Sequence, residues 1–408
     1  MSLFASMRAP RTIVFGSGQR NAVPGYARPL GQKALIVTDA RMGASADLAA
    51  MVDGLKAAGL TVAVFDQTLP EVPLECIAQC VAFGRAFGPD LLIGLGGGSC
   101  LDMAKVAAVL LRHGGSPRDY FGEFKVPGPV LPLIAVPTTA GTGSEATPVA
   151  VVADSERLLK VGIASPHIIP LVAICDPELT LSAPAGLTAI AGADALTHAI
   201  EALTAGPRVV DADSSLDHVF LGKNALSDGH AREAIGHLAR GLRRSVDNGQ
   251  DLAARESVMY GALLAGLAFG TAGTAAAHAI QYPVGALTKT AHGAGVACLM
   301  PYAMSFNLSH ATQSMAEVAV AMGVAEAGDD ARGNGERAIV AVETLFAGIG
   351  IPADLKALGL REDQLDWTAE QSLGAARLVK NNPRPLDLSA MQAIVRAAFA
   401  GDRTRLAH

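Results

Sequence analysis

The chain has 408 residues, half of them hydrophobic and 17% charged, which is enough apolar material for two domains with large cores. Its net charge of −6 and its lack of a long basic run argue against nucleic acid and anionic membrane surfaces as partners. Its five cysteines are scattered and odd in number, which fits a reduced, cytoplasmic protein rather than a disulfide framework.

The first 184 residues alternate strand-like and helix-like segments. Short apolar or β-branched runs, typical of strands buried in a sheet, lie at residues 12–16, 33–39, 60–65, 90–95, 130–136 and 171–175. Helical patterns separate most of these runs. Strands that alternate with helices at this spacing predict a mostly parallel, Rossmann-like α/β sheet.

The pattern changes after Pro184, where strand signals almost vanish. Helical patterns follow at residues 185–204, 226–246, 250–270, 288–305, 311–323, 335–349, 363–378 and 388–400. We therefore predict an α/β domain at residues 1–184 and an all-α domain at residues 185–408.

Two glycine-rich turns follow strands of the first domain. Gly94–Ser99 opens a helix, a geometry in which backbone N–H groups bind a phosphate, although a plain tight turn also needs these glycines. Ser99 is a good N-cap for that helix, with Asp102 three residues later. The second turn, Pro137–Glu145, would lie at the same sheet edge. Asp39, at a third strand end, could accept a hydrogen bond from a ribose hydroxyl and would repel a 2′-phosphate, which favours NAD over NADP, although taken alone it is better explained as a solvated loop aspartate.

Four residues of the second domain could bind one metal ion. Asp194 and His198 stand four residues apart in a helical pattern, so both side chains project from one apolar face. His278 and His292 bracket a segment that Pro283 should interrupt, so that the chain folds back and brings both imidazoles together. Three imidazoles and one carboxylate suit Fe²⁺, Zn²⁺ or another late divalent metal. Each histidine taken alone is also compatible with a structural role.

Four motifs in this order resemble the iron-containing (group III) alcohol dehydrogenase family. They are Gly96–Asp102, Pro137–Glu145, Gly192–Glu201 and His278–Gly293. The resemblance covers nearly the whole chain. It implies a dinucleotide-binding domain at residues 1–184 and a helical metal and substrate domain at residues 185–408.

The resemblance also implies roles for individual residues. The metal ligands, all of them catalytic, would be Asp194, His198, His278 and His292. The residues that line NAD(H) would be Asp39, Gly97, Gly98, Ser99, Asp102, Thr138, Thr139, Thr142, Ser144 and Lys160. Phe269 falls where the family has an aromatic residue near the substrate.

Two positions depart from the family's pattern. Tyr282 stands where many members carry a histidine near the reacting centre, so it is a candidate for both catalysis and substrate contact. Members that act on hydroxy acids are similar in having tyrosine there. Glu71 stands where the family commonly has asparagine.

Together these features predict a metal-dependent enzyme that transfers a hydride between NAD(H) and an alcohol/aldehyde or hydroxy acid/oxo acid pair, with Fe²⁺ preferred to Zn²⁺. We expect small-molecule partners, no nucleic acid or membrane partner, a homo-oligomer such as a dimer, and a cytoplasmic location. One alternative is an enzyme similar to glycerol dehydrogenase or dehydroquinate synthase. The other is a nucleotide-binding protein that has lost catalysis.

Overall fold

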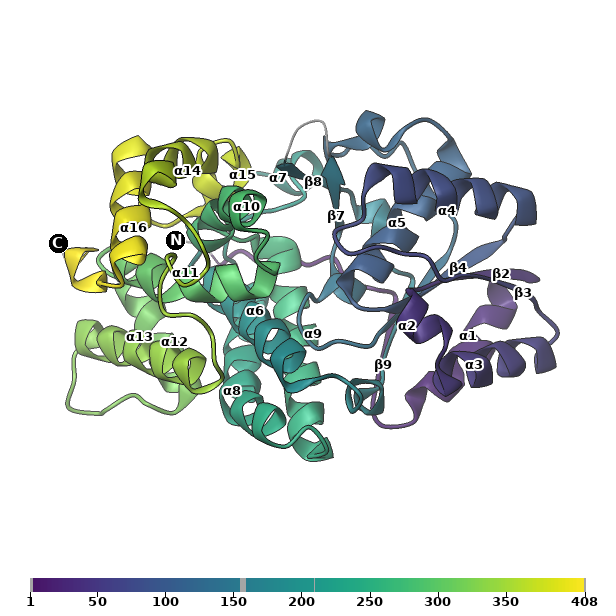
Figure 1. Ribbon diagram of the computed structural model, residues 1–408, viewed down its shortest axis with the longest axis horizontal. Coiled ribbons are helices and arrows are strands. Elements are labelled where there is room, and N and C mark those ends of the chain that lie inside the picture. The colour runs from purple at the N-terminus through teal and green to yellow at the C-terminus, as the bar shows by residue number, and fades with distance from the viewer. Residues whose placement is uncertain (1–2, 155–158, 209, 407–408) are drawn as a thin grey trace. The chain divides into compact units, whose positions relative to one another are not determined.

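The computed structural model describes residues 3–154, 159–208 and 210–406. The chain forms two compact units (Figure 1). The α/β unit comprises Arg8–Ser182 and Ser215–Val219. The helical unit comprises Ala183–Ser214 and Phe220–His408, together with the segment that precedes Arg8. The main change of unit therefore falls between Ser182 and Ala183.

The α/β unit is built on a six-stranded sheet in which every pairing is parallel. In spatial order the strands are β1 (Thr12–Phe15), β9 (Val172–Cys175), β6 (Leu133–Pro137), β4 (Leu91–Gly96), β2 (Lys33–Val37) and β3 (Thr61–Phe65). The chain runs outward from β2 to β3 and then returns to β4 on the other side of β2, so a topological switch point lies between β2 and β4. The predicted Rossmann-like fold class is confirmed.

Helices cover both faces of this sheet, which Figure 1 shows with α4 and α5 above the strands and α1 and α3 below them. Their bounds are α1 (Val23–Ala27), α2 (Ala40–Gly43), α3 (Ala46–Ala57), α4 (Leu74–Phe87) and α5 (Gly98–His113). Successive residues of β2 enter different cores: Leu35 packs with α4 and α5, whereas Ile36 packs with α1 and α3. Because both faces of the strand are buried, its sequence is a continuous apolar run.

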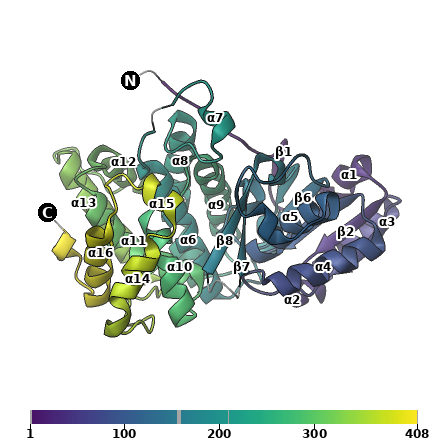
Figure 2. The ribbon, with the colours of Figure 1, turned by 90° about the horizontal axis from the view of Figure 1, so that it is seen from above.

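A smaller sheet accompanies the large one. It contains β5 (Gly122–Glu123), β8 (Leu159–Ala164) and β7 (Val149–Asp154) in that order. Strands β7 and β8 are antiparallel and lie side by side in Figure 2. Strand β7 also packs against α5 through Ala150 and Val152, so the small sheet shares a core with the large one.

The helical unit has no strand among its described residues. Its helices are α6 (Ala185–Thr204), α8 (Ala225–Asp247), α9 (Leu252–Ala272), α10 (Ala276–Thr288), α11 (His292–Asn307), α12 (Thr312–Met322), α13 (Ala331–Gly348), α14 (Leu365–Ser372), α15 (Ala376–Asn381) and α16 (Leu388–Ala400). The short α7 (Ser214–Asp217) lies where the chain passes from one unit to the other.

Helix α9 is long and apolar enough to cross a membrane by length and composition, the one such helix in the described part of the chain. However, 72% of its apolar window is buried inside the protein. A helix that is hydrophobic all round is also what the core of a large helical unit requires. The apolar character of α9 is thus accounted for by packing.

Two sequence predictions about local structure are wrong. Helix α10 runs through Pro283 without a break and ends at Lys289, which has a φ of 58°. Proline already has a helical φ and removes one backbone N–H, so a well-packed helix can contain it, and the chain instead reverses after Lys289. Helix α5 begins at Gly98 with Gly97 as its N-cap, so Ser99 lies inside the first turn and does not cap it.

Candidate metal centre and nucleotide-binding turns

Helix α6 carries two carboxylates in a buried, apolar sequence. Asp194 and Glu201 are only 4% and 2% exposed. His198, between them, is also buried. A carboxylate that leaves water needs hydrogen bonds, an ion pair or a metal to offset its lost hydration. The surroundings of both carboxylates supply such partners.

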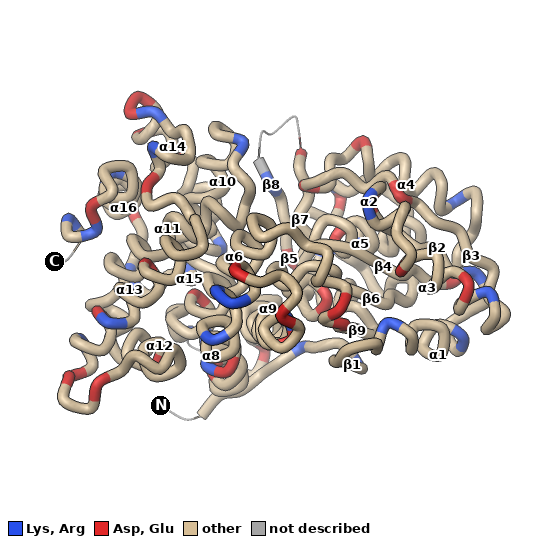
Figure 3. Tube along the Cα trace, turned by 60° about the horizontal axis from the view of Figure 1, so that its bottom comes forward, with Lys and Arg blue, Asp and Glu red and all other residues tan. Residues whose placement is uncertain are grey.

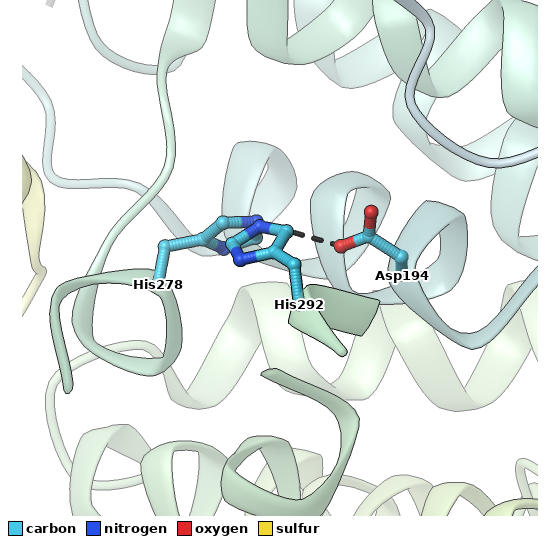
Figure 4. A group of neighbouring side chains, drawn as sticks. All are labelled: Asp194, His278 and His292. Carbon is cyan, nitrogen blue, oxygen red and sulfur yellow. Dashed lines mark ion pairs between the residues drawn. The ribbon is translucent and has the colours of Figure 1, made fainter. Parts of the chain in front are cut away.

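Asp194, His278 and His292 point toward one another from α6, α10 and the first residue of α11 (Figure 4). One ligand atom from each lies within 4.8 Å of the others. Asp194 Oδ1 is 3.7 Å from His278 Nε2 and 3.8 Å from His198 Nε2. His198 lies outside the three-residue cluster, and its ring stacks on His278 and on Phe269 at centroid distances of 4.6 and 4.2 Å.

The cluster fits a divalent metal. Asp194 Oδ1 and His278 Nε2 are buried, and neither makes a hydrogen bond with the described residues. Their separation of 3.7 Å is too long for a hydrogen bond. Two ligands that bind one ion tetrahedrally, each at about 2.1 Å, stand about 3.4 Å apart. Imidazole and carboxylate ligands also suit Fe²⁺ and Zn²⁺.

Two glycines near the start of α11 let three helices approach closely. A Cβ on Gly293 would lie 2.3 Å from the carbonyl oxygen of Ile190 in α6. A Cβ on Gly295 would lie 1.7 Å from Oε1 of Gln281 in α10. A side chain at Gly293 would meet the backbone of α6 and push α11 away, whereas one at Gly295 would first displace the Gln281 amide.

The electrostatic field of the cluster favours a cation. Burial by itself would raise the pKa of Asp194, but the neighbouring imidazoles, that of His198 above all, hold it well below its usual value. The carboxylate therefore stays charged at neutral pH. Burial would likewise lower the pKa of His278, but the carboxylates of Glu201 and Asp194 raise it to about 9. Without a metal the ring therefore holds a second proton at neutral pH, and a metal that binds Nε2 would displace that proton.

The two substrate candidates lie beside the cluster. Phe269 stacks on His198 with an angle of 14° between the rings. Tyr282 stacks on His292 with a centroid distance of 6.2 Å and an angle of 25°. Burial raises the pKa of Tyr282, so its hydroxyl stays protonated at neutral pH. Two aromatic faces thus adjoin the proposed ligands.

The two glycine-rich turns meet at the carboxyl ends of β4 and β6. Thr138 N donates a hydrogen bond of 2.9 Å to Gly96 O. A Cβ on Gly98 would lie 2.5 Å from Cγ2 of Thr142, so this glycine is required for the turns to touch. Thr139 lies near Gly97, the N-cap of α5. No side chain caps this helix, which leaves its first N–H groups available for a phosphate.

Three more cofactor candidates are Asp39 and Ser99, which follow strands of the large sheet, and Lys160, which lies in β8 of the small sheet. Asp39 follows β2 at the switch point and caps α2 by accepting a hydrogen bond of 2.9 Å from Met42 N. Ser99 Oγ accepts a hydrogen bond of 3.2 Å from Glu71 N. Lys160 Nζ is 2.8 Å from Glu71 Oε1, so Glu71 contacts two of the candidates.

Asp102 and Ser144 bond to each other inside the protein. Ser144 Oγ donates to one carboxylate oxygen of Asp102 at 2.6 Å, and Val151 N donates to the other at 3.0 Å. The pair therefore ties the second glycine-rich turn to α5.

Two functional candidates are absent from the sequence prediction. Glu201 bonds to His278, and its place on the same helix face as His198 was the available signal. Lys105 is fully buried in α5 and donates to the carbonyl oxygens of Thr147 and Val149 at 3.0 and 2.7 Å. Lys105 could have been noticed in the sequence because it is a single charged residue within a long apolar helical pattern.

A parallel sheet with glycine-rich turns at its edge and a carboxylate–imidazole cluster on buried helices are features of an oxidoreductase that uses a nucleotide and a metal. The sequence matches two family models, "Iron-containing alcohol dehydrogenase" over residues 10–177 and "Fe-containing alcohol dehydrogenase family, C-terminal" over residues 188–399. The chain belongs to the iron-containing alcohol dehydrogenase family.

Individual relatives cover almost the whole chain. Long-chain-alcohol dehydrogenase 1 of Geobacillus thermodenitrificans is 37% identical over 93% of this chain and 92% of its own length. The NAD-dependent methanol dehydrogenase of Bacillus methanolicus is 34% identical over 96% of this chain and 98% of its own length. The crystal structure of a 1,3-propanediol oxidoreductase superimposes with a TM-score of 0.90, at 34% identity, over 97% of this chain and 100% of that one.

The main functional prediction is therefore confirmed. The protein is a metal-dependent oxidoreductase of the alcohol dehydrogenase class whose cofactors are NAD(H) and a divalent metal, iron in the family name. Neither alternative, a relative of glycerol dehydrogenase or dehydroquinate synthase or a protein without catalysis, gains support from these relatives.

Proposed function

We propose that the enzyme interconverts primary alcohols and aldehydes at the Asp194–His278–His292 cluster of the helical unit. The observation that carries this proposal is that Asp194 Oδ1 and His278 Nε2 are buried without a hydrogen bond among the described residues, in a cluster beside the aromatic faces of Phe269 and Tyr282. Residues 1–184 would serve as the dinucleotide-binding domain and residues 185–408 as the metal and substrate domain.

Four side chains would hold the metal: Asp194, His198, His278 and His292. When bound, the metal supplies Lewis-acid polarisation of the substrate oxygen. Phe269 and Tyr282 would bound the carbon chain of the substrate with their ring faces. The ring of Tyr282 stacks on that of His292, and its hydroxyl would pass the substrate proton toward solvent.

The glycine-rich turns would orient NAD(H). The uncapped N-terminus of α5 would bind the pyrophosphate, together with Ser99, Thr138, Thr139, Thr142 and Lys160. Asp39 would bond to the ribose and disfavour a 2′-phosphate. Oxidation then moves a hydride from the carbinol carbon to nicotinamide C4 and releases one proton, which yields an aldehyde and NADH.

We favour an uncharged alcohol over a hydroxy acid as the substrate. Lys223, a cation that could meet a substrate carboxylate, donates to Leu203 O at 3.0 Å and to Ser314 Oγ at 2.9 Å, and it pairs with Asp228 at 3.2 Å. The relatives are named for a long-chain alcohol, methanol and 1,3-propanediol. We therefore favour the alcohol/aldehyde pair.

A cytoplasmic homodimer without nucleic acid or membrane partners completes the proposal. All five cysteines are buried and free, as in a reducing compartment. In the view of Figure 3 acidic and basic residues are interspersed along the described trace, and the net charge is −6, which supports the absence of a nucleic-acid partner.

Turnover with defined metals tests the proposed function. Metal-depleted protein would be reloaded with Fe²⁺ or Zn²⁺ and assayed for NADH formation with methanol, butanol, octanol and 4-hydroxybutyrate. We expect the reloaded enzyme to oxidise at least one alcohol with a higher kcat/KM than the hydroxy acid. Full activity in metal-free Asp194→Ala would overturn the metal assignment, and a preference for the hydroxy acid would overturn the substrate assignment.

A further inference from the structure

Glu201 accepts three hydrogen bonds at one point of the helical unit. Its Oε2 accepts from His278 Nδ1 at 2.6 Å and from Ala275 N at 2.8 Å. Its Oε1 accepts from Ala277 N at 2.8 Å. The side chain is 2% exposed, so these three donors replace its hydration.

Two of these donors belong to the N-terminus of α10. Ala275 is the N-cap of that helix and has no side chain that can accept a hydrogen bond. The first N–H groups of a helix have no partner within the helix. Glu201 therefore caps α10 from a different helix, and this fixes the position of the turn that carries His278.

The third bond determines which nitrogen of His278 carries a proton. An ionised carboxylate can only accept, so His278 Nδ1 must donate. In the neutral imidazole the lone pair then lies on Nε2. This is the nitrogen that lies 3.7 Å from Asp194 Oδ1 and has no hydrogen bond of its own among the described residues.

We propose that Glu201 is a positioning residue for the metal: its carboxylate orients the His278 ring and fixes the tautomer in which Nε2 binds the ion. The inference rests on the proposed role of His278 as a ligand. Carboxylates that bond to metal-binding histidines act in this manner in other metal sites, and their loss weakens metal binding about 10- to 100-fold.

Glu201→Gln separates this role from simple packing. All three partners of Glu201 are N–H donors, whereas glutamine has one acceptor oxygen and one NH₂ donor. With its NH₂ group in the place of Oε1, glutamine faces the N–H of Ala277, and with its NH₂ group in the place of Oε2 it faces both the N–H of Ala275 and His278 Nδ1. In the second orientation His278 can accept a hydrogen bond at Nδ1 only if its proton moves to Nε2. That tautomer cannot bind a metal through Nε2.

A matched control lies in the same helix. Thr204 is 3% exposed, and its Oγ1 donates a hydrogen bond of 2.8 Å to Ile200 O. Thr204→Val removes this buried hydrogen bond but leaves the Glu201–His278 contact intact. Any general effect of disturbing α6 should therefore appear in this variant too.

The test measures metal affinity rather than turnover. Metal-free wild type, Glu201→Gln, Thr204→Val and His278→Ala would be titrated with Zn²⁺ against a chelator, without NAD, after circular dichroism has verified the fold. We expect Glu201→Gln to bind Zn²⁺ about 10- to 100-fold more weakly than wild type and Thr204→Val to bind it normally. If folded Glu201→Gln bound Zn²⁺ as tightly as wild type while His278→Ala bound it weakly, the positioning role of Glu201 would be overturned and the ligand role of His278 would stand. Wild-type affinity in His278→Ala would overturn the proposed ligand role.

A second measurement does not depend on the variant's folding. In ¹⁵N-histidine-labelled wild type loaded with Cd²⁺, we expect His278 to couple to cadmium through Nε2 and to carry its proton on Nδ1. Cadmium coupling to Nδ1, or the absence of a proton there, would overturn the inference.

Discussion

At the scale of single residues, Glu71 offers a direct test of the nucleotide site. Its φ of 64° is unfavourable for a side chain of this type, and asparagine tolerates that region better. Its carboxylate pairs with Lys160 at 2.8 Å. Glu71→Asn should therefore release Lys160 to the cofactor phosphates, and the Kd for NADH should fall about two- to fivefold, as expected for an exposed ion pair.

Fluorescence titration with NADH checks this expectation. Asp53→Asn is the matched control, because it removes one negative charge from an exposed position on α3. This control should leave the Kd unchanged. Equal or weaker NADH binding by Glu71→Asn would show that the Glu71–Lys160 pair does not compete with the cofactor.

Sequence patterns point to the candidate metal ligands whose side chains are brought together by their spacing along one helix. Asp194 and His198 were readable because four residues make one helical turn. For Glu201 the spacing indicates only that it shares a helix face with His198, because its hydrogen bonds depend on the uncapped N-terminus of α10, which starts more than seventy residues later. Asp102 was assigned to the cofactor, but its hydrogen bonds to Ser144 and Val151 depend on how the second turn packs.

At the scale of elements, contact between the two glycine-rich turns should control NADH affinity. A Cβ on Gly98 would lie 2.5 Å from Thr142 Cγ2, 3.0 Å from its Oγ1 and 3.1 Å from its Cβ. Gly98→Ala should therefore separate the turns and raise the Kd for NADH about tenfold or more, as overpacking typically costs about 1–3 kcal/mol.

A second substitution tests this explanation. Thr142→Ser removes Cγ2 but keeps the Oγ1 that accepts a hydrogen bond from Ser144 N at 3.3 Å. The double variant should recover part of the lost affinity, while Thr142→Ser alone should change it little. A double variant no better than Gly98→Ala would point to a cause other than this clash.

The buried carboxyl of Glu145 should make stability depend on pH. Burial raises its pKa from 4.5 to about 7, with Lys105 opposing the shift. Between these values the folded state binds more protons than the unfolded state, so the free energy of unfolding falls as pH rises. Glu145→Gln should remove this loss, which amounts to about 3 kcal/mol at most.

Urea unfolding of both proteins at several pH values, without NAD, measures the effect. The advantage of Glu145→Gln should be smallest below pH 4.5, where the carboxyl is mostly protonated in both states, and should grow until about pH 7. A constant difference across this range would contradict the assignment.

The strands of the large sheet were predictable, whereas the start of α10 and its course through Pro283 were not. Strands such as β2 are buried on both faces and leave a continuous apolar run in the sequence. Proline inside a helix is unfavourable by propensity alone. In α10 it is tolerated because the helix packs against α11 and α14, a tertiary effect that local patterns do not contain.

At the scale of the whole molecule, the sequence shows where alternating strands and helices give way to helices alone, near Pro184. It does not show that two short segments each belong to the unit on the other side of that boundary. Residues before Arg8 belong to the helical unit, where Phe4 O accepts a hydrogen bond from Ala225 N at 3.2 Å. Ser215–Val219 belongs to the α/β unit, where Val219 O accepts from Arg8 Nη1 at 3.0 Å. These assignments depend on contacts between residues about 200 positions apart.

The separation of the candidate sites between the two units predicts separable losses. All proposed metal ligands belong to the helical unit, and all proposed cofactor residues belong to the α/β unit. A metal that binds only the folded state stabilises it by about 2.7 kcal/mol when its free concentration is 100 times its Kd. Metal removal should therefore destabilise the helical unit, whereas NADH should stabilise the α/β unit even without metal.

Calorimetry of wild type and His278→Ala, each with and without a chelator and with and without NADH, tests this division. We expect the chelator to lower the Tm of metal-loaded wild type much more than that of His278→Ala, because the variant binds the metal weakly. We expect NADH to raise the Tm of both proteins to a similar extent, because its proposed contacts lie in the other unit. Loss of NADH stabilisation in His278→Ala would show that the metal centre helps to form the nucleotide site, and the two functions would then have to be assigned to one cooperative unit.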